Sequence, residues 1–256
     1  MSPRLPAVAL AAAAALFVTA APPAAAQSFT PEQRKEIEAI VKDYLIKNPE
    51  ILRDVAAALE KQQAEADAAK GRKAITEHAA TLSNSPRQVV LGNPKGDVTM
   101  VEFFDYNCGY CKRAMVDMLD LLKNDPKLRV VLKEFPVLGE GSVEAAKIAA
   151  AATMQDKGGK KYLEFHRKLL TGRGRIAKDQ AIAAAKAAGF DVAKLERDAE
   201  SAEVRKALEE SFMLAEALGL NGTPSYVIGS NVVIGAVGLA KLKENISQAR
   251  CGKPTC

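Results

Sequence analysis

The sequence predicts an α/β fold in which a strand–helix–strand unit and a strand–strand–helix unit are separated by a helical insertion, preceded by a helical N-terminal segment. Three observations support this prediction. Two apolar runs of strand length flank an amphipathic stretch between residues 98 and 136. An almost wholly helical pattern follows at about 140–219, and two short strand patterns with a last helical pattern come after it.

Residues 1–26 have the layout of a secretory signal peptide. MSPR supplies a short positive start, LPAVALAAAAALFVTA is an apolar run, and small residues lead to a cleavage site after Ala26. A permanent membrane anchor is the alternative, but the run is short for a spanning helix and consists mostly of alanine. We therefore expect a mature protein exported to a bacterial periplasm, where cysteine pairs persist as disulfides or exchange them.

The composition is that of an ordinary soluble globular protein. The net charge of +5 arises from 36 basic and 31 acidic residues, which are spread along the chain instead of forming blocks. A nucleic-acid-binding protein more often gathers Lys and Arg on one element with aromatic residues between them. We therefore expect no nucleic-acid partner.

Residues 27–60 form the predicted N-terminal helical segment. Thr30 is placed to cap its first helix, with Pro31 at the first helical position and Gln33 able to complete a capping box. A second helix restarts at Asn48-Pro49. The apolar positions of the two helices form stripes made of Ile37, Ile40, Val41, Tyr44, Leu45, Ile51, Leu52, Val55 and Leu59.

These stripes need a partner surface, because two short amphipathic helices cannot bury enough apolar area alone. The partner is either the domain that follows or another copy of the chain. Residues 61–82 are polar, alanine-rich and helix-prone, which is typical of a helical linker, and a linker favours the second choice. We therefore expect a homo-oligomer joined through residues 27–60.

The main domain is expected over residues 83–256. Its first part contains a short strand within VVLGNPKGD, a buried strand in VTMVEFF at 98–104, and a second buried strand in LRVVLKEFP at 128–136. The amphipathic helix between the two buried strands opens with CGYC. Cys108 and Cys111 therefore lie at a strand-to-helix turn.

The rest of the main domain is mostly helical. The insertion at about 140–219 has breaks at 158–159, 171–175 and 189–191. Two strands, SYVI and NVVI, then flank a turn at Gly229-Ser230, and the final helix runs to Cys251.

The turn position gives the two cysteines different chemistry. At the start of a helix, the sulfur of Cys108 meets unpaired backbone N–H groups and the positive end of the helix dipole, which both stabilise a thiolate. We expect Cys108 to be the exposed, attacking sulfur. Cys111 lies deeper and would act as the resolving thiol that releases a mixed disulfide.

A metal site and a structural crosslink are the competing interpretations of this pair. Zinc takes about four ligands, whereas the pair supplies two, and His78 and His166 lack ligand spacing. A crosslink that closes so short a loop removes little chain entropy. We therefore expect no metal and no cofactor other than a redox-active disulfide, because a CxxC in a strand–helix–strand pattern favours thiol exchange.

A second cysteine pair and one histidine complete the residues that could carry chemistry. Cys251 and Cys256 are expected to form a local structural disulfide, since the Gly and Pro between them argue against a second helix start. His166 lies in an amphipathic helix without a base or nucleophile partner, so we expect a structural or surface role.

The motifs VEFFDYNCGYC and, downstream, GTPSYVIG resemble those of DsbA-like periplasmic thiol–disulfide oxidoreductases over about residues 85–250. The resemblance implies a thioredoxin fold (β-α-β, helical insertion, β-β-α), protein substrates with cysteines or disulfides, and a membrane redox partner protein. The N-terminal extension is similar to that of ScsC-type members, which trimerise through it and act as disulfide isomerases. A trimer is therefore favoured over a dimer.

The resemblance also assigns supporting residues. Thr223-Pro224 resembles the cis-proline loop that faces the cysteines, where exposed backbone groups can pair with a substrate strand; a plain trans-proline turn is the alternative. Glu102 resembles the buried acid beneath the active site, a proton acceptor for Cys111 whose pKa burial would raise. Lys133 could pair with Glu102, and the alternative for both is a surface position.

Gly109 and Tyr110 depart from the family's oxidase pattern, which has Pro-His between the cysteines. Without that histidine the helix turn alone lowers the pKa of Cys108, so a strongly oxidising potential is less assured and isomerase or reductase activity is favoured. We predict an exported disulfide isomerase or reductase. The alternatives are a dithiol oxidase and, from another class, a copper-binding or chaperone module that uses the thiols as soft ligands.

Overall fold

The computed structural model describes residues 29–156 and 159–256. The chain divides into two compact units, and the boundary between them along the chain lies between Ala57 and Ala58. The predicted signal peptide at residues 1–26 lies outside the described residues. In the part of the chain that is described, no helix combines the length and the apolar character that a membrane span requires.

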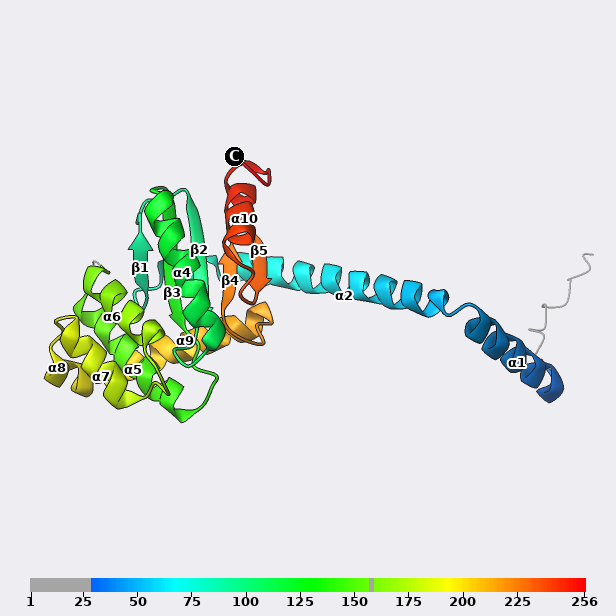
Figure 1. Ribbon diagram of the computed structural model, residues 1–256, viewed down its shortest axis with the longest axis horizontal. Coiled ribbons are helices and arrows are strands. Elements are labelled where there is room, and N and C mark those ends of the chain that lie inside the picture. The colour runs from blue at the N-terminus through cyan, green and yellow to red at the C-terminus, as the bar shows by residue number, and fades with distance from the viewer. Residues whose placement is uncertain (1–28, 157–158) are drawn as a thin grey trace, which may run out of the picture. The chain divides into compact units, whose positions relative to one another are not determined.

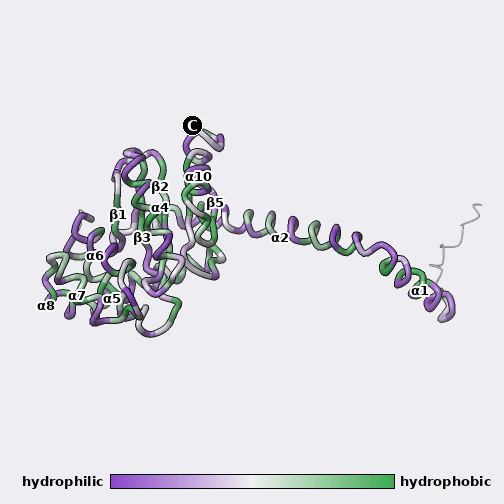
Figure 2. The backbone as a smooth tube through the Cα atoms, in the orientation of Figure 1, coloured by the Kyte–Doolittle hydropathy of each residue, from purple (hydrophilic) through white to green (hydrophobic). Residues whose placement is uncertain are grey.

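The first unit contains helix α1 (Pro31–Lys47) and the start of helix α2 (Glu50–Glu77). The predicted capping box at α1 is confirmed: the Gln33 amide donates to Thr30 Oγ1 (3.3 Å), and the Thr30 amide donates to Gln33 Oε1 (2.9 Å). Helix α1 buries none of its residues. Figure 2 shows hydrophobic and hydrophilic positions mixed along it.

Helix α2 is continuous over 28 residues, so the predicted change from segment to linker at residue 60 falls inside one helix. The polarity of the sequence changes there, but no proline or helix-ending glycine interrupts the backbone. The last turns of α2 are not a free linker, because Gly71 and Ala74 are buried. A Cβ on Gly71 would lie 3.0 Å from Val232 Cγ2, so this glycine permits a close approach to the sheet.

The second unit is built on a five-stranded sheet with the order β1-β3-β2-β4-β5 (Figure 1). Strands β2 and β3 are parallel and every other pair is antiparallel, as expected for the predicted β-α-β and β-β-α units. The strands are β1 (Val89–Gly92), β2 (Val98–Phe104), β3 (Leu128–Glu134), β4 (Ser225–Ile228) and β5 (Asn231–Ile234).

Helices cover the sheet and form the predicted insertion. Helix α4 (Gly109–Asn124) joins β2 to β3, α10 (Leu239–Cys251) follows β5, and α3 (Ala79–Asn84) precedes β1. The insertion helices α5 to α8 gather beside one another in Figure 1. The bounds of the insertion helices are α5 (Glu140–Gln155), α6 (Lys160–Thr171), α7 (Lys178–Ala187), α8 (Val192–Ala199) and α9 (Ala202–Leu218).

The sheet separates two hydrophobic clusters. On its front face, Met100 and Phe104 pack with residues of α4, α10 and the insertion helices. On its back face, Val101 and Phe103 pack with residues of α9, α3 and the end of α2. Successive residues of β2 therefore serve opposite faces, as the two-residue period of a strand requires.

Candidate active site

Cys108 is the N-cap residue of α4, in an extended conformation with φ −78° and ψ 115°. At this position a Ser or Asp side chain usually accepts the orphan N–H groups of the first turn. Here the sulfur takes that place without a side-chain capping hydrogen bond, and the nearby amides of Tyr110 and Cys111 lower the pKa of the thiol. Both active-site cysteines are free thiols in the structure.

The predicted order of depth is confirmed, since Cys108 is 6% exposed and Cys111 is fully buried. Cys108 is nevertheless less exposed than the sequence led us to expect. The cause is a loop from the other half of the sheet: the Cys108 thiol donates to the Thr223 carbonyl oxygen at 3.1 Å. A substrate must therefore reach this sulfur beside that loop.

The two sulfurs differ strongly in acidity. The pKa of Cys108 falls from 9.0 to about 5, first through the hydrogen bond with the Cys111 thiol and then through those from the Thr223 side chain and the helix amides, although burial opposes the shift. The pKa of Cys111 is raised well above its usual value by the same thiol pair and by burial. At neutral pH Cys108 therefore ionises and gives up its hydrogen bond to the Thr223 carbonyl, while Cys111 remains a thiol.

The Thr223–Pro224 peptide bond is cis, which confirms the prediction for this loop. Strand β4 starts directly after Pro224, whose carbonyl accepts the Gly235 amide at 2.8 Å. Ser225 Oγ donates to the Gly222 carbonyl at 2.7 Å, which holds the approach to the turn. The loop thereby presents Thr223 to Cys108 from a fixed position.

Glu102 is buried on the front face of the sheet, opposite Tyr226 of β4, with 2% of its surface exposed. Burial, together with the negative charge of Asp117, raises the pKa of Glu102 from 4.5 to about 8. A charge on Glu102 in turn raises the pKa of Cys111. The predicted buried acid is therefore in place beneath the resolving thiol.

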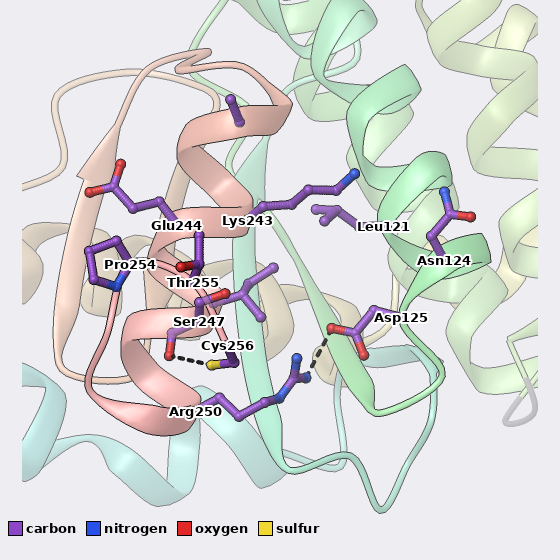
Figure 3. Close-up of a pocket in the computed structure, with 12 residues that line it drawn as sticks. Leu121, Asn124, Asp125, Lys243, Glu244, Ser247, Arg250, Pro254, Thr255 and Cys256 are labelled. Carbon is purple, nitrogen blue, oxygen red and sulfur yellow. Dashed lines mark hydrogen bonds and ion pairs between the residues drawn. The ribbon is translucent and has the colours of Figure 1, made fainter.

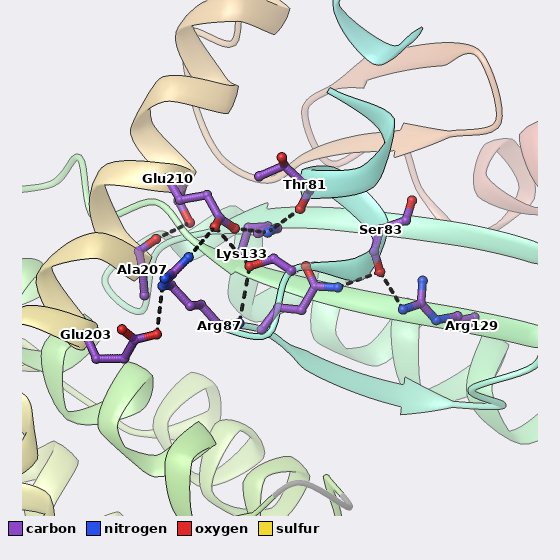
Figure 4. Close-up of polar contacts among 11 residues, drawn as sticks. Thr81, Ser83, Arg87, Arg129, Lys133, Glu203, Ala207 and Glu210 are labelled. Carbon is purple, nitrogen blue, oxygen red and sulfur yellow. Dashed lines mark hydrogen bonds and ion pairs between the residues drawn. The ribbon is translucent and has the colours of Figure 1, made fainter. Parts of the chain in front are cut away.

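The predicted pairing of Lys133 with Glu102 is wrong. In the parallel register Glu102 is opposite Leu132 and Phe103 is opposite Lys133, so the lysine projects from the back face. Figure 4 shows its actual partners: Lys133 Nζ lies 2.7 Å from Glu210 Oε1 and donates to the Thr81 carbonyl at 3.0 Å.

Lys133 belongs to a charged network that attaches α3 and α9 to the back of the sheet (Figure 4). Glu210 Oε2 accepts from Ser85 Oγ at 2.9 Å and lies 3.5 Å from the Arg87 guanidinium. Arg87 also pairs with Glu203 at 2.8 Å. Because these charges are buried or half-buried and paired with one another, the network is structural.

A second polar network, which sequence reasoning missed, holds the active-site turn. Asp105 Oδ1 accepts the Asn107 amide (2.7 Å) and Ser142 Oγ (2.8 Å), while Oδ2 accepts the Leu138 amide (2.9 Å). The Asn107 side chain accepts the Ile176 amide (2.7 Å) and donates to the Ile176 carbonyl (2.8 Å). The signal was present in the sequence: DYN lies between a buried strand and the first cysteine, where polar groups need partners.

His166 has the structural role that the sequence predicts. It is buried, and burial lowers its pKa from 6.5 to about 3, so the ring is neutral. Its Nδ1 lies 3.1 Å from the hydroxyl of Tyr106, whose ring packs edge-on against Phe104. The Tyr162 hydroxyl donates to buried Glu134 at 2.8 Å in the same cluster.

The predicted disulfide between Cys251 and Cys256 is present. It lies at the end of α10, where the Ser247 carbonyl oxygen is 3.3 Å from each sulfur. A cavity of about 670 Å³ adjoins it, lined by Cys256, the final turn of α4 and much of α10 (Figure 3). This cavity is at the other end of α4 from Cys108, so it is not part of the dithiol site.

The described residues contain no group of three or more His, Cys, Asp or Glu side chains placed to hold a metal ion. Among the groups described above, the dithiol has the chemistry for a reaction of its own. It combines an acidic, nucleophilic sulfur, a second sulfur in the first turn of the same helix, and a buried acid below the two sulfurs.

Comparisons with known proteins agree with this geometry. The model of the DSBA-like thioredoxin domain family matches residues 99–247, and that of the copper resistance protein ScsC N-terminal domain matches residues 33–66. A thiol:disulfide interchange protein DsbA from Bordetella pertussis is 27% identical over 169 residues, which cover 62% of this chain and 78% of that protein.

Two solved structures extend the comparison. A thioredoxin-like oxidoreductase from Silicibacter pomeroyi is 44% identical, with a TM-score of 0.63, and the match covers 67% of this chain and 96% of the other. ScsC from Proteus mirabilis, in a transitional conformation, is 26% identical with a TM-score of 0.64, covering 88% and 100%. The chain therefore belongs to the DsbA-like thioredoxin-domain family of thiol–disulfide oxidoreductases and is close to ScsC.

Proposed function

We propose that this protein is a periplasmic disulfide isomerase and reductase, which works as a homo-oligomer joined through its N-terminal helices. The observation that carries the proposal is the combination of a thiolate at Cys108 with an apolar stripe on α1 that is exposed in the single chain. Ile40 is 67% exposed and Tyr44 is 58% exposed, although both are large apolar residues at helical spacing. The signal-peptide layout of residues 1–26 supports export.

The exposed stripe supports assembly because such a surface needs a partner in water. Large apolar side chains are also exposed on the first half of α2, where Leu52 is 56% and Val55 is 59% exposed. Joining copies through these helices would give each assembly several dithiols. A client with wrongly paired cysteines could then exchange repeatedly before it is released, which favours isomerisation over a single transfer.

The proposed chemistry begins at Cys108. Its thiolate attacks one sulfur of a client disulfide, a mixed disulfide forms, and the second client sulfur leaves as a thiolate. In isomerisation, a different client thiolate attacks the mixed disulfide, so that Cys108 leaves as the thiolate again and no electrons are gained or lost overall. The substrate strand would pair with the backbone beside Thr223.

In reduction, Cys111 loses its proton and attacks the Cys108 sulfur. The Cys108–Cys111 disulfide forms, and the client receives two electrons and leaves with both of its cysteines reduced. The ionised form of Glu102, which is the minor form at neutral pH because its pKa is about 8, is the proposed acceptor of the Cys111 proton, since the charge of this buried acid acts on Cys111. A membrane reductase would then return two electrons to the dithiol.

A dithiol oxidase is the second candidate, and the acidity of Cys108 favours it. A pKa of about 5 stabilises the reduced form at neutral pH, so the oxidised form would tend to give its disulfide away. Here the thiol pair, the Thr223 side chain and the helix amides produce the shift without the histidine of the oxidase motif.

Two refolding assays separate these candidates. Reduced protein should restore activity to a substrate with scrambled disulfides, and Cys108→Ser should not. Oxidised protein acting only on a fully reduced substrate would identify an oxidase. Tight copper binding without turnover in either assay would support the binding module instead.

Assembly is tested with matched surface variants of α1. Ile40→Ser/Tyr44→Ser should convert the assembly to monomers in sedimentation and lower isomerisation, while leaving peptide exchange unchanged. Glu38→Ser/Lys42→Ser is the control, because those side chains are exposed on the same helix. If both double variants keep the mass of the wild-type assembly, the N-terminal helices do not join the copies.

A further inference from the structure

The loop from Gly172 to Ile176 is held against the active-site turn at both of its ends. At one end, Lys112 Nζ donates to the Gly172 carbonyl at 2.8 Å. At the other, the side chain of Asn107 forms two hydrogen bonds with the Ile176 backbone, at 2.7 and 2.8 Å. Asn107 directly precedes Cys108 in the chain, so the loop is fixed beside the nucleophile.

Two arginines lie between these anchoring points. Arg173 and Arg175 are exposed, and neither forms an ion pair or hydrogen bond within the described residues. Gly141, at the start of α5, has no side chain, and a Cβ there would lie 3.0 Å from Arg175 Nε. The Arg175 side chain therefore extends over the first turn of α5. That turn carries one acidic residue, Glu140, which forms no ion pair with Arg175 among the described residues.

The first turn of α4 adds cations to the same rim. Arg113 is exposed and stacks over the Tyr110 ring with 4.3 Å to the centroid, and the Lys112 ammonium has a neutral carbonyl as its partner. Residues 109–113 and 172–176 together carry four basic side chains and no acidic one: Lys112, Arg113, Arg173 and Arg175. The next basic residue along the loop, Lys178, is excluded because it is ion-paired with Glu196 at 3.3 Å. Elsewhere the chain mixes the two signs, so this rim is a local excess of positive charge.

We propose that Arg173 and Arg175, together with Arg113, select client segments in which the reacting cysteine is flanked by acidic side chains. This inference rests on the proposed function, because it concerns the clients of the same dithiol. Arginine suits the role, since its planar guanidinium binds carboxylates through paired hydrogen bonds and it retains its charge. A segment extended along Thr223 would present its flanking side chains to a rim of one sign, which speeds encounter.

The test uses three peptides that differ only beside the cysteine, with Asp, Ser or Lys on both sides. Each is supplied as a mixed disulfide with a small chromophoric thiol, and the second-order rate of thiol release by the reduced, full-length protein is measured. At low salt the Asp peptide should react about tenfold faster than the Lys peptide. The difference should collapse in 1 M salt, where the screening length falls to about 3 Å.

Variants identify the residues responsible. Arg173→Gln/Arg175→Gln should lose most of the preference for the Asp peptide but keep the rate with the Ser peptide within about twofold. Lys186→Gln/Arg197→Gln removes the same charge from exposed positions on α7 and α8, and should keep the preference. If the first double variant keeps the preference, or slows all three peptides equally, the inference is overturned.

Failure of the inference and failure of the proposed function are distinguishable. If all three peptides react with the wild-type protein at one rate, the basic rim does not select clients, although the dithiol is active. If none reacts faster with the wild-type protein than with Cys108→Ser, the exchange function itself is wrong, and the inference falls with it.

Discussion

The two cysteine pairs of this protein lie at opposite ends of their helices, and their sulfurs therefore meet opposite electrostatic environments. Cys108 is the N-cap residue of α4, where the amides of Tyr110 and Cys111 in the first turn lower the pKa of its thiol. Cys251 is the last residue of α10, where the Ser247 carbonyl lies 3.3 Å from the sulfur. Amides and the positive dipole end stabilise a thiolate, whereas carbonyls and the negative end disfavour one.

This difference teaches that the helix end, more than the presence of a pair, separates a reactive dithiol from a structural disulfide. In both pairs the two cysteines are only a few residues apart, and both pairs belong to a chain whose N-terminus has the layout of an export signal. The first also has a buried acid and a cis-proline loop beside it. The second has a mostly polar, exposed C-terminal loop.

The largest expected effect comes from removing the nucleophilic sulfur of the first pair, with removal of the whole second pair as the comparison. Cys108→Ser should lower the rate of disulfide exchange by at least about a thousandfold, because it removes the nucleophile. Cys251→Ser/Cys256→Ser should leave that rate within about twofold. A peptide exchange assay measures both, and a large loss in the second variant would break the distinction between the pairs.

The pH dependence of alkylation tests the cause of the difference. In reduced protein the rate of Cys108 alkylation should fall as the pH is lowered, with a midpoint near pH 5. The reason is that the thiolate is the reacting form and the pKa of Cys108 is about 5. Mass spectrometry of the modified peptide measures it. A midpoint near pH 8 would contradict the proposed stabilisation of the thiolate.

The same shift affects folding stability, and its sign follows from linkage. The folded pKa of Cys108 lies below its unfolded value of 9.0, so the stabilisation of reduced protein is complete above pH 9 and is lost as pH falls through about 5. The oxidised protein lacks this contribution. The Tm of the reduced form relative to the oxidised form should therefore decrease from pH 8 to pH 5 in calorimetry.

Glu102→Gln should stabilise the protein at pH 7 by on the order of 2–3 kcal/mol. The pKa of Glu102 is about 8 when folded against 4.5 when exposed, so its burial costs free energy as pH rises above 4.5. Urea unfolding at pH 7 and at pH 4 measures the change, which should vanish at pH 4. Resolution of the mixed disulfide should be slower in this variant, and equal stabilisation at both pH values would exclude a titrating acid.

Loss of the Cys251–Cys256 disulfide should have the smallest effect. The bridge joins residues five apart, so it removes about 2 kcal/mol or less of unfolded-chain entropy. Cys251→Ser/Cys256→Ser should lower the free energy of unfolding by no more than that amount in denaturant titrations. A loss of several kcal/mol would show that the C-terminal loop contributes to the core.

Local patterns were sufficient to predict the strands, the insertion helices and the cysteine turn. The apolar run at 98–104, the Pro-and-Gly breaks and the CGYC motif each act within a few residues. Cys111, Pro224 and Glu102 lie where they were expected. The capping box at Thr30 was readable for the same reason, because its partners are three residues apart.

The errors concern contacts between residues distant in sequence. Lys133 was assigned to Glu102 because both are charged residues in buried strands, but its side depends on the register between β2 and β3. The hydrogen bonds from Asn107 to Ile176 join residues 69 apart, and the hydrophobic periodicity of the sequence does not predict them. The carbonyl of Thr223 covers Cys108 for the same reason: two halves of the sheet must first come together.

The alternation of β2 has a consequence for how this protein can be altered. Glu102 and Phe103 are neighbours in the chain, yet one side chain faces the dithiol and the other packs against α9, α3 and the end of α2. Lys133, Glu210 and Arg87 are confined to the second side. The sheet thus works as a partition, and changes to the attachment of the N-terminal helices can be made behind it without retuning the sulfur chemistry in front.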